Sequence, residues 1–197
     1  MADQHQSAPA VCQCVFQTLN GNQVEMVGGF VHHNQPRLFE QAQGKLISLD
    51  PNYSPRIWPD FDEARRVIRH MMGYTTFTKP SLDDAQRIFG TGKTPEDYIT
   101  LFHEMGPRVV VLTMGGAGMI LSVEGRQTFI PAQPVKIVDA TGAGDSFWAG
   151  FLVALLDGNP LERCVLFARE IVGRKLVRMG PLPDTIDRDE VYRAIGR

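Results

Sequence analysis

One continuous apolar run constrains the fold of this 197-residue chain more than any other feature. Residues 109–113 read Val-Val-Val-Leu-Thr and are bounded by Pro107 and Gly115. A β-branched run with no polar alternation is typical of a strand that is buried on both faces. Such strands belong to parallel sheets that helices cover on both sides. The run therefore predicts an α/β fold with residues 109–113 near the centre of the sheet.

Helical patterns and shorter apolar runs alternate along the rest of the chain. The runs that predict further strands lie at residues 46–49, 77–79 and 135–138, with a hairpin over 118–131 that turns at 124–126. Apolar residues recur at helical spacing over residues 61–72, 83–89, 95–105, 147–156, 161–179 and 189–195. Thr94 and Pro95 fit the N-cap and first position of the third of these helices. This alternation predicts a three-layer α/β/α sandwich with a mostly parallel sheet that begins near Lys45.

The first part of the chain has a different composition. Residues 1–46 hold five of the 42 charged residues but eight of the eleven glutamines. Residues 1–13 are mostly small or polar, which predicts disorder, and one strand with a turn is expected around residues 24–31. We therefore divide the chain into an atypical, partly disordered segment over residues 1–44 and an ordered body over residues 45–197.

Charge and cysteine content exclude several classes of protein. The formal net charge is −2, which gives no electrostatic basis for binding nucleic acid or an anionic membrane. No apolar run approaches the ~20 residues that span a bilayer, and the chain begins without the basic and apolar stretches of a secretory signal. Three cysteines do not suggest a disulfide framework. The expected location is the cytoplasm.

The segment most informative about chemistry is Asp-Ala-Thr-Gly-Ala-Gly-Asp-Ser-Phe at residues 139–147. It follows the predicted strand at 135–138 and leads into a helix that begins near Asp145. Backbone N–H groups of Gly142, Ala143 and Gly144, with the helix N-terminus behind them, would form an anion-binding site. A carboxylate at Asp145 would repel a bound phosphate, unless it takes a proton from a hydroxyl group that attacks the phosphoryl group. The alternative is that Asp145 only caps its helix.

Six ordered motifs, including this one, resemble those of the ribokinase-like (PfkB) carbohydrate kinases. The best resemblance is to the fructokinase and 2-keto-3-deoxygluconate kinase branch. The motifs lie at residues 50–58, 79–84, 113–118, 139–147, 167–169 and 178–183. The resemblance covers about residues 45–197, whereas family members are about twice as long as this region. It implies the family's sandwich fold, here N-terminally incomplete.

The resemblance implies a role for individual residues. Asp145 would be the general base, with Gly142, Ala143 and Gly144 as the anion hole. The nucleotide would be bound by Ser81, Thr113, Gly115, Gly116, Gly118 and Arg169, and the sugar by Asp50 and Asn52. Asp84 would organise Mg²⁺ through water. Asp139 and Thr141, with carbonyl groups near Arg178 and Gly180, would hold a monovalent cation such as K⁺. The implied cofactors are therefore ATP, Mg²⁺ and K⁺.

Two functional hypotheses remain open at this stage. The first is an ATP-dependent sugar kinase that is truncated, with little activity expected because much of the sugar site is missing. The second is a non-catalytic remnant that binds nucleotide or a partner chain, in keeping with the missing N-terminal half and with departures from the family pattern at Ser54, Ser81 and Arg169. A nicotinamide-dependent enzyme is disfavoured because the glycines lie far down the chain and no strand that ends in an acid follows them at the required spacing. The predicted strand at 46–49 would form an unprotected sheet edge, which a second copy or a partner would cover.

Overall fold

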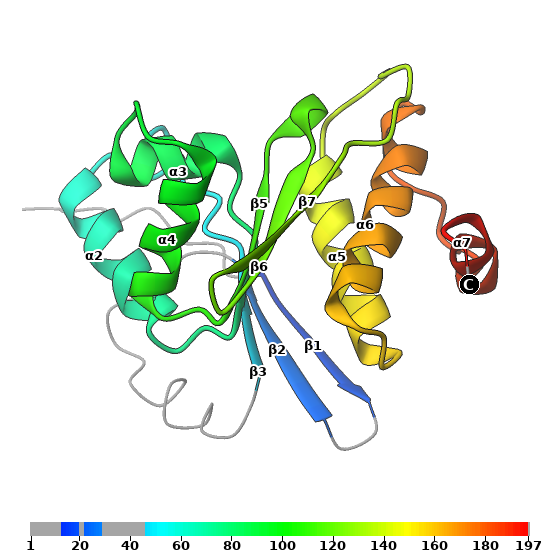
Figure 1. The fold of residues 1–197 in the computed structure, drawn as a ribbon, viewed down its shortest axis with the longest axis horizontal. Helices are drawn as coiled ribbons and strands as arrows, with labels where there is room; N and C mark the ends of the chain where they lie inside the picture. Colours follow the sequence, from blue (N-terminus) through cyan, green and yellow to red (C-terminus); the bar gives the residue numbers. More distant parts are fainter. Residues whose placement is uncertain (1–12, 20–21, 29–45, 197) are drawn as a thin grey trace, which may run out of the picture.

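The computed structural model describes residues 13–19, 22–28 and 46–196, which build one seven-stranded sheet covered by helices (Figure 1). The strands lie side by side in chain order: β1 (Gln13–Leu19), β2 (Asn22–Gly28), β3 (Leu46–Leu49), β4 (Phe77–Thr78), β5 (Val109–Thr113), β6 (Met119–Val123) and β7 (Arg126–Ile130). Strands β2 to β5 run parallel, whereas β1 is antiparallel to β2, and β6 and β7 continue antiparallel from β5. The hairpin between β6 and β7 is the one predicted from the sequence.

Helices cover both faces of this sheet, so the predicted three-layer sandwich is confirmed (Figure 1). One layer holds α2 (Phe61–Met72), α3 (Leu82–Phe89) and α4 (Pro95–Met105). The other holds α5 (Ala143–Leu156) and α6 (Leu161–Leu176), with α7 (Arg188–Ala194) on the outer side of α6. In the part of the chain that the structure describes, no helix has the length and apolar character needed to cross a membrane.

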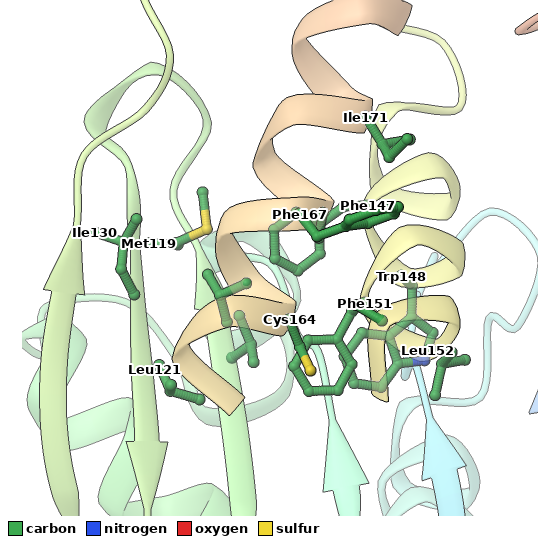
Figure 2. Close-up of a cluster of buried hydrophobic side chains, with 14 of the residues drawn as sticks. Met119, Leu121, Ile130, Phe147, Trp148, Phe151, Leu152, Cys164, Phe167 and Ile171 are labelled. Atoms are coloured by element: carbon green, nitrogen blue, oxygen red, sulfur yellow. The ribbon is translucent and has the colours of Figure 1, made fainter. Parts of the chain in front are cut away.

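Strand β5 shows why the sheet needs helices on both faces. Its Val109 and Val111 side chains belong to the core on the α5 and α6 side, and Val110 and Leu112 to the core on the α2 to α4 side. In the first of these cores, aromatic residues of α5 and α6 pack together and β6 supplies aliphatic side chains (Figure 2). Burial on both faces explains the continuous apolar run that predicted this strand.

Two helices begin with the side chains that their sequences indicate. Ser81 caps α3 and Thr94 caps α4, and each accepts a hydrogen bond from the backbone N–H three residues later. The acids at those third positions, Asp84 and Asp97, bond back to the backbone N–H of the cap residue. The predicted cap at Thr94 is therefore confirmed, and α3 begins one residue before the predicted start.

The predicted sheet edge at residues 46–49 is wrong. Strand β3 is paired on both sides, with β4 in one direction and with β2 in the other, where Val24 lies opposite Leu46. The sheet therefore begins before Lys45, and its own strands cover the edge for which a partner was expected. The disorder expected of residues 1–12 lies outside the described residues, but Gln13 and the six residues after it form β1.

The predicted strand at residues 135–138 is also wrong. Residues 131–138 form no strand, and the backbone N–H of Val138 donates to the carbonyl of Leu176 at the end of α6, at 2.7 Å. Pro131 and Pro134 lack the N–H groups that pairing with a neighbouring strand would need. The loop that leads into α5 is thus held by a helix end. Helix α6 itself ends three residues before the predicted position.

A buried hydrogen bond connects α5 to the sheet and can be tested directly. The indole N–H of Trp148 donates to the hydroxyl oxygen of Ser48 on β3 at 2.7 Å, and Ser48 is only 1% exposed. We expect Trp148→Phe to lower the free energy of unfolding by about 1–3 kcal/mol, because the Ser48 hydroxyl loses its donor. Urea denaturation measures this. Adding Ser48→Ala should recover part of the loss, and an equal loss in both variants would show that packing alone is responsible.

Candidate active site

An open cleft of about 590 Å³ lies where the parallel strands β3, β4 and β5 end. This volume is within the range of small-molecule sites. Each strand delivers one polar residue to the cleft directly after its last residue or at its end: Asp50, Lys79 and Thr113. The first turn of α5 supplies the opposite wall. Ligands of open α/β sheets bind at this end of the strands, so the cleft is the candidate active site.

The first turn of α5 carries an anion site and a free carboxylate. Gly142 is the N-cap, with φ at 74°, and no side chain caps the helix. The N–H of Ala143 donates to the carbonyl of Ala140 at 3.1 Å, whereas the N–H groups of Gly144 and Asp145 donate to no side chain among the described residues. Asp145 is exposed in the cleft and has no hydrogen-bond or ion-pair partner among the described residues. Its carboxylate is therefore not used to cap the helix and is available to a ligand.

Lys79 is a site residue to which the sequence analysis assigned no role. Its ammonium group lies 2.7 Å from Oδ2 of Asp50, and the side chains are 5% and 19% exposed. A methyl group placed on Gly144 would lie 3.1 Å from the same ammonium nitrogen, so a buried positive charge faces the anion site. Burial raises the pKa of the Asp50 carboxyl, and Lys79 opposes this rise. The available signal was that Asp50 directly follows the predicted strand at 46–49 and that Lys79 ends the predicted strand at 77–79.

The loop after β5 faces the same cleft as the first turn of α5, as the two motifs require. Thr113, Gly115 and Gly118 line the cleft, and residues 115–117 form a short 3₁₀ helix. The backbone N–H of Thr113 donates to the carbonyl of Pro80, which fixes this loop against the start of α3. Ser81 also lines the cleft, whereas Gly116 is exposed and does not.

Asp50 and Asn52 form the turn after β3 and both line the cleft. The backbone N–H of Asn52 donates to Oδ1 of Asp50 at 3.3 Å. Asn52 has φ at 36°, in the left-handed region that asparagine tolerates better than most residues. This strained turn holds an amide and a carboxylate at the mouth of the cleft, which suits hydrogen bonding to hydroxyl groups.

Asp84 is committed to structural hydrogen bonds. Its Oδ2 accepts from the hydroxyl and the backbone N–H of Ser81 at 2.6 and 3.0 Å, and its Oδ1 accepts from the backbone N–H of Tyr53 at 2.9 Å. The side chain borders the cleft but the residue is only 4% exposed. It therefore joins the start of α3 to the turn after β3, and direct coordination of a metal ion would compete with these bonds.

Asp139 lies behind the anion site, in contact with α6. Its Oδ1 accepts from the backbone N–H of Thr141 at 2.9 Å, and its Oδ2 accepts from the backbone N–H of Gly180 at 3.2 Å. The Lys175 ammonium lies 3.1 Å from Oδ2 and also 3.1 Å from the Asp139 carbonyl oxygen. The N–H of Thr141, followed by Lys175, holds the Asp139 pKa well below its ordinary value. Neither Asp139 nor Thr141 lines the cleft, although Ala140 between them does.

Two other conspicuous residues lie away from the cleft. Arg169 on α6 donates to the carbonyl of Pro131 at 3.3 Å and is not among the lining residues. Cys164 is buried in the core on the same helix, and burial raises the pKa of its thiol to about 11. Across the described residues, no group of three or more His, Cys, Asp or Glu side chains gathers to hold a metal ion.

Comparison with known proteins identifies one family of kinases. The model of the pfkB family of carbohydrate kinases matches residues 22–173. The chain is 36% identical over 147 residues to an ATP-dependent 6-phosphofructokinase of Thermoanaerobacterium thermosaccharolyticum, covering 74% of this chain and 45% of that protein. It is 33% identical over 126 residues to the 2-dehydro-3-deoxygluconokinase of Escherichia coli, covering 62% and 40%.

A solved structure shows the same fold. A double mutant of the fructokinase from Vibrio cholerae, crystallised with fructose, ADP and a potassium ion, superimposes with a TM-score of 0.65 at 24% identity, over 72% of this chain and 48% of that one. The chain thus spans less than half the length of each of these three proteins. The family match also begins at residue 22, which is 23 residues before the expected boundary at Lys45.

Proposed function

Because the chain belongs to the pfkB family of carbohydrate kinases, we propose that it carries the nucleotide-binding and base-bearing part of an ATP-dependent sugar kinase. The observation that carries this proposal is the arrangement of the cleft. The anion site at Gly142–Gly144, the free carboxylate of Asp145 and the loop after β5 all face one space. The acceptor is a sugar hydroxyl, in keeping with the sugar kinases among the relatives.

Asp145 acts as the general base. Its carboxylate has no partner among the described residues and stands at the third position of α5, directly beside the N–H groups that would bind the phosphoryl group. A sugar hydroxyl held there loses its proton to Asp145 as its oxygen attacks the γ-phosphorus. The bond from the γ-phosphorus to the bridging oxygen of ATP breaks in the same displacement, and ADP leaves with that oxygen. The hydroxyl oxygen that loses its proton is also the atom that bonds to phosphorus, so the base must lie next to the anion site. Asp145 directly follows Gly144 and meets this requirement.

Positive charge for the transferring phosphoryl group comes from two sources in this chain. The N-terminus of α5 presents backbone N–H groups and the positive end of its dipole. The Lys79 ammonium faces the same turn from the end of β4 and is fixed in place by Asp50. A preorganised, buried charge stabilises developing negative charge more than a solvated one does.

Mg²⁺ would enter with ATP, and the phosphate oxygens would supply most of its ligands, as is usual for this ion. Asp84 fits only the indirect role predicted for it, through water, because its own oxygens are engaged with Ser81 and Tyr53. When bound, the ion neutralises charge on the phosphates and aligns them. Asn52 and Asp50, at the mouth of the cleft, are the residues that we propose contact the sugar.

Calorimetric titration of the full chain with MgATP tests the proposal. We expect saturable binding that Gly144→Val weakens about tenfold or more, since a branched side chain there would enter the space beside Lys79. Ala149→Val is the matched control, because it places the same branched side chain at an exposed position of α5 outside the lining of the cleft. Absence of MgATP binding, or equal effects of both variants, would count against this site.

A further inference from the structure

The contact between Lys175 and Asp139 bears on the predicted potassium site. The sequence resemblance assigns Asp139, Thr141 and carbonyl groups near residues 178 and 180 to a monovalent cation. In the structure the ammonium group of Lys175 already occupies a position beside Asp139. The Lys175 ammonium is shared between the carboxylate and the carbonyl oxygen of Asp139, at 3.1 Å each. The Lys175 side chain is 3% exposed and that of Asp139 is 17% exposed, so the contact is largely shielded from solvent.

The oxygen atoms of Asp139 have little capacity left for a metal ion. An ionised carboxylate offers about four acceptor positions. Three of them are used, by the N–H of Thr141, the N–H of Gly180 and the Lys175 ammonium. A potassium ion bound to the same oxygen atoms would also lie close to the ammonium group, and two like charges at such a distance repel strongly in a buried setting. The residues present therefore do not fit a potassium ion while Lys175 keeps this position.

The ammonium group also makes the connection that a bound cation would make. It joins the loop that leads into the anion site to the last turn of α6. The N–H groups of Val138 and Asp139, which both donate to the Leu176 carbonyl, reinforce the same junction. Ammonium and potassium ions carry the same charge and take oxygen ligands, so one can replace the other. The loop that presents Gly142 to Asp145 is thus positioned by a side chain of the protein.

We infer that Lys175 is a built-in monovalent cation, which makes the anion-site loop of this chain independent of potassium. Lys175 is a positioning residue, since it acts through Asp139 and does not line the cleft. The expected effect of Lys175 on nucleotide binding rests on the proposed function. The expected effect of Lys175 on the stability of the fold is independent of that proposal, because the contact with Asp139 exists without a ligand.

The test compares chloride salts of potassium and tetramethylammonium at equal ionic strength. For the wild-type chain we expect the same melting temperature in both salts. Lys175→Met should melt about 5–10 °C lower in tetramethylammonium, because the partly buried carboxylate of Asp139 loses its charged partner. Potassium should restore this loss with a saturable dose dependence. Lys136→Met, at an exposed lysine three residues before Asp139, is the matched control and should respond to neither salt.

Calorimetry with MgATP in the same salts gives the second readout. We expect equal affinity for the wild type, and for Lys175→Met about tenfold weaker binding that potassium recovers. A saturable, potassium-specific rise in wild-type melting temperature would overturn the inference, and so would a Lys175→Met variant that does not respond to potassium. If that variant does not fold, the wild-type comparison decides alone. Failure of MgATP binding would reject the proposed function but leave the melting experiment to decide on Lys175.

Discussion

Asp145→Asn is expected to lower the rate of phosphoryl transfer by about 10²–10⁴-fold, the usual contribution of a positioned general base. The asparagine amide has nearly the same shape as the carboxylate but cannot accept the proton of the attacking hydroxyl. Affinity for MgATP should stay the same or increase, since removing a negative charge beside the anion site relieves repulsion from the phosphates. A coupled assay of ADP formation measures the rate, with fructose, fructose 6-phosphate and 2-dehydro-3-deoxygluconate as acceptors.

Asp83→Asn is the matched control for this experiment. Asp83 also lines the cleft, but it is exposed, and its ion-pair partner is Arg87 at 3.9 Å, on the surface of α3. The same change of charge and shape at this position should leave the rate almost unaltered. If both variants lost similar activity, general electrostatics of the cleft would explain the effect. If Asp145→Asn kept the full rate, Asp145 would be a helix-terminal acid without a role as base.

The parts of the candidate site whose placement could be predicted from the sequence depend on residues that are close in the chain. Gly142, Asp145 and the helix that follows them form one local unit, and the apolar positions of α5 dictate where its first turn lies. The same holds for α3 and α4, where a cap and an acid three residues later specify the helix start. The sandwich itself could be predicted because β5 is apolar on both faces, which only helices on both sides can satisfy.

The parts that the sequence did not predict depend on partners far apart in the chain. Lys175 and Asp139 are 36 positions apart, and a lysine near a helix C-terminus is expected in solvent, where it suits the helix dipole. Pairing of β2 with β3 was missed because the tendency to form strands depends on the neighbours a segment finds. The segment at 135–138 looks like a strand, but its backbone N–H groups find the end of α6 instead of a neighbouring strand.

Lys79→Met is expected to have the largest effect on stability. Removing one partner of a buried ion pair leaves Asp50 without compensation, which costs about 3–5 kcal/mol of unfolding free energy. The loss should depend on pH. Without Lys79 the pKa of Asp50 rises further above its ordinary value of 3.8, so the folded state holds this proton more tightly than the unfolded state does. The deficit of the variant relative to the wild type should therefore grow as the pH increases above about 4, and urea denaturation at several pH values measures it.

The double variant Asp50→Asn with Lys79→Met separates folding from nucleotide binding. It removes the uncompensated carboxylate, so we expect it to recover much of the unfolding free energy and to lose the pH dependence. It does not return the ammonium group to the first turn of α5, so its affinity for MgATP should remain as weak as that of the single variant. Wild-type affinity in the double variant would show that Lys79 serves only to neutralise Asp50. Weak binding in a restored fold would identify Lys79 as a ligand of the phosphates, because loss of the Asp50 carboxylate alone would reduce repulsion from the nucleotide and would not weaken its binding.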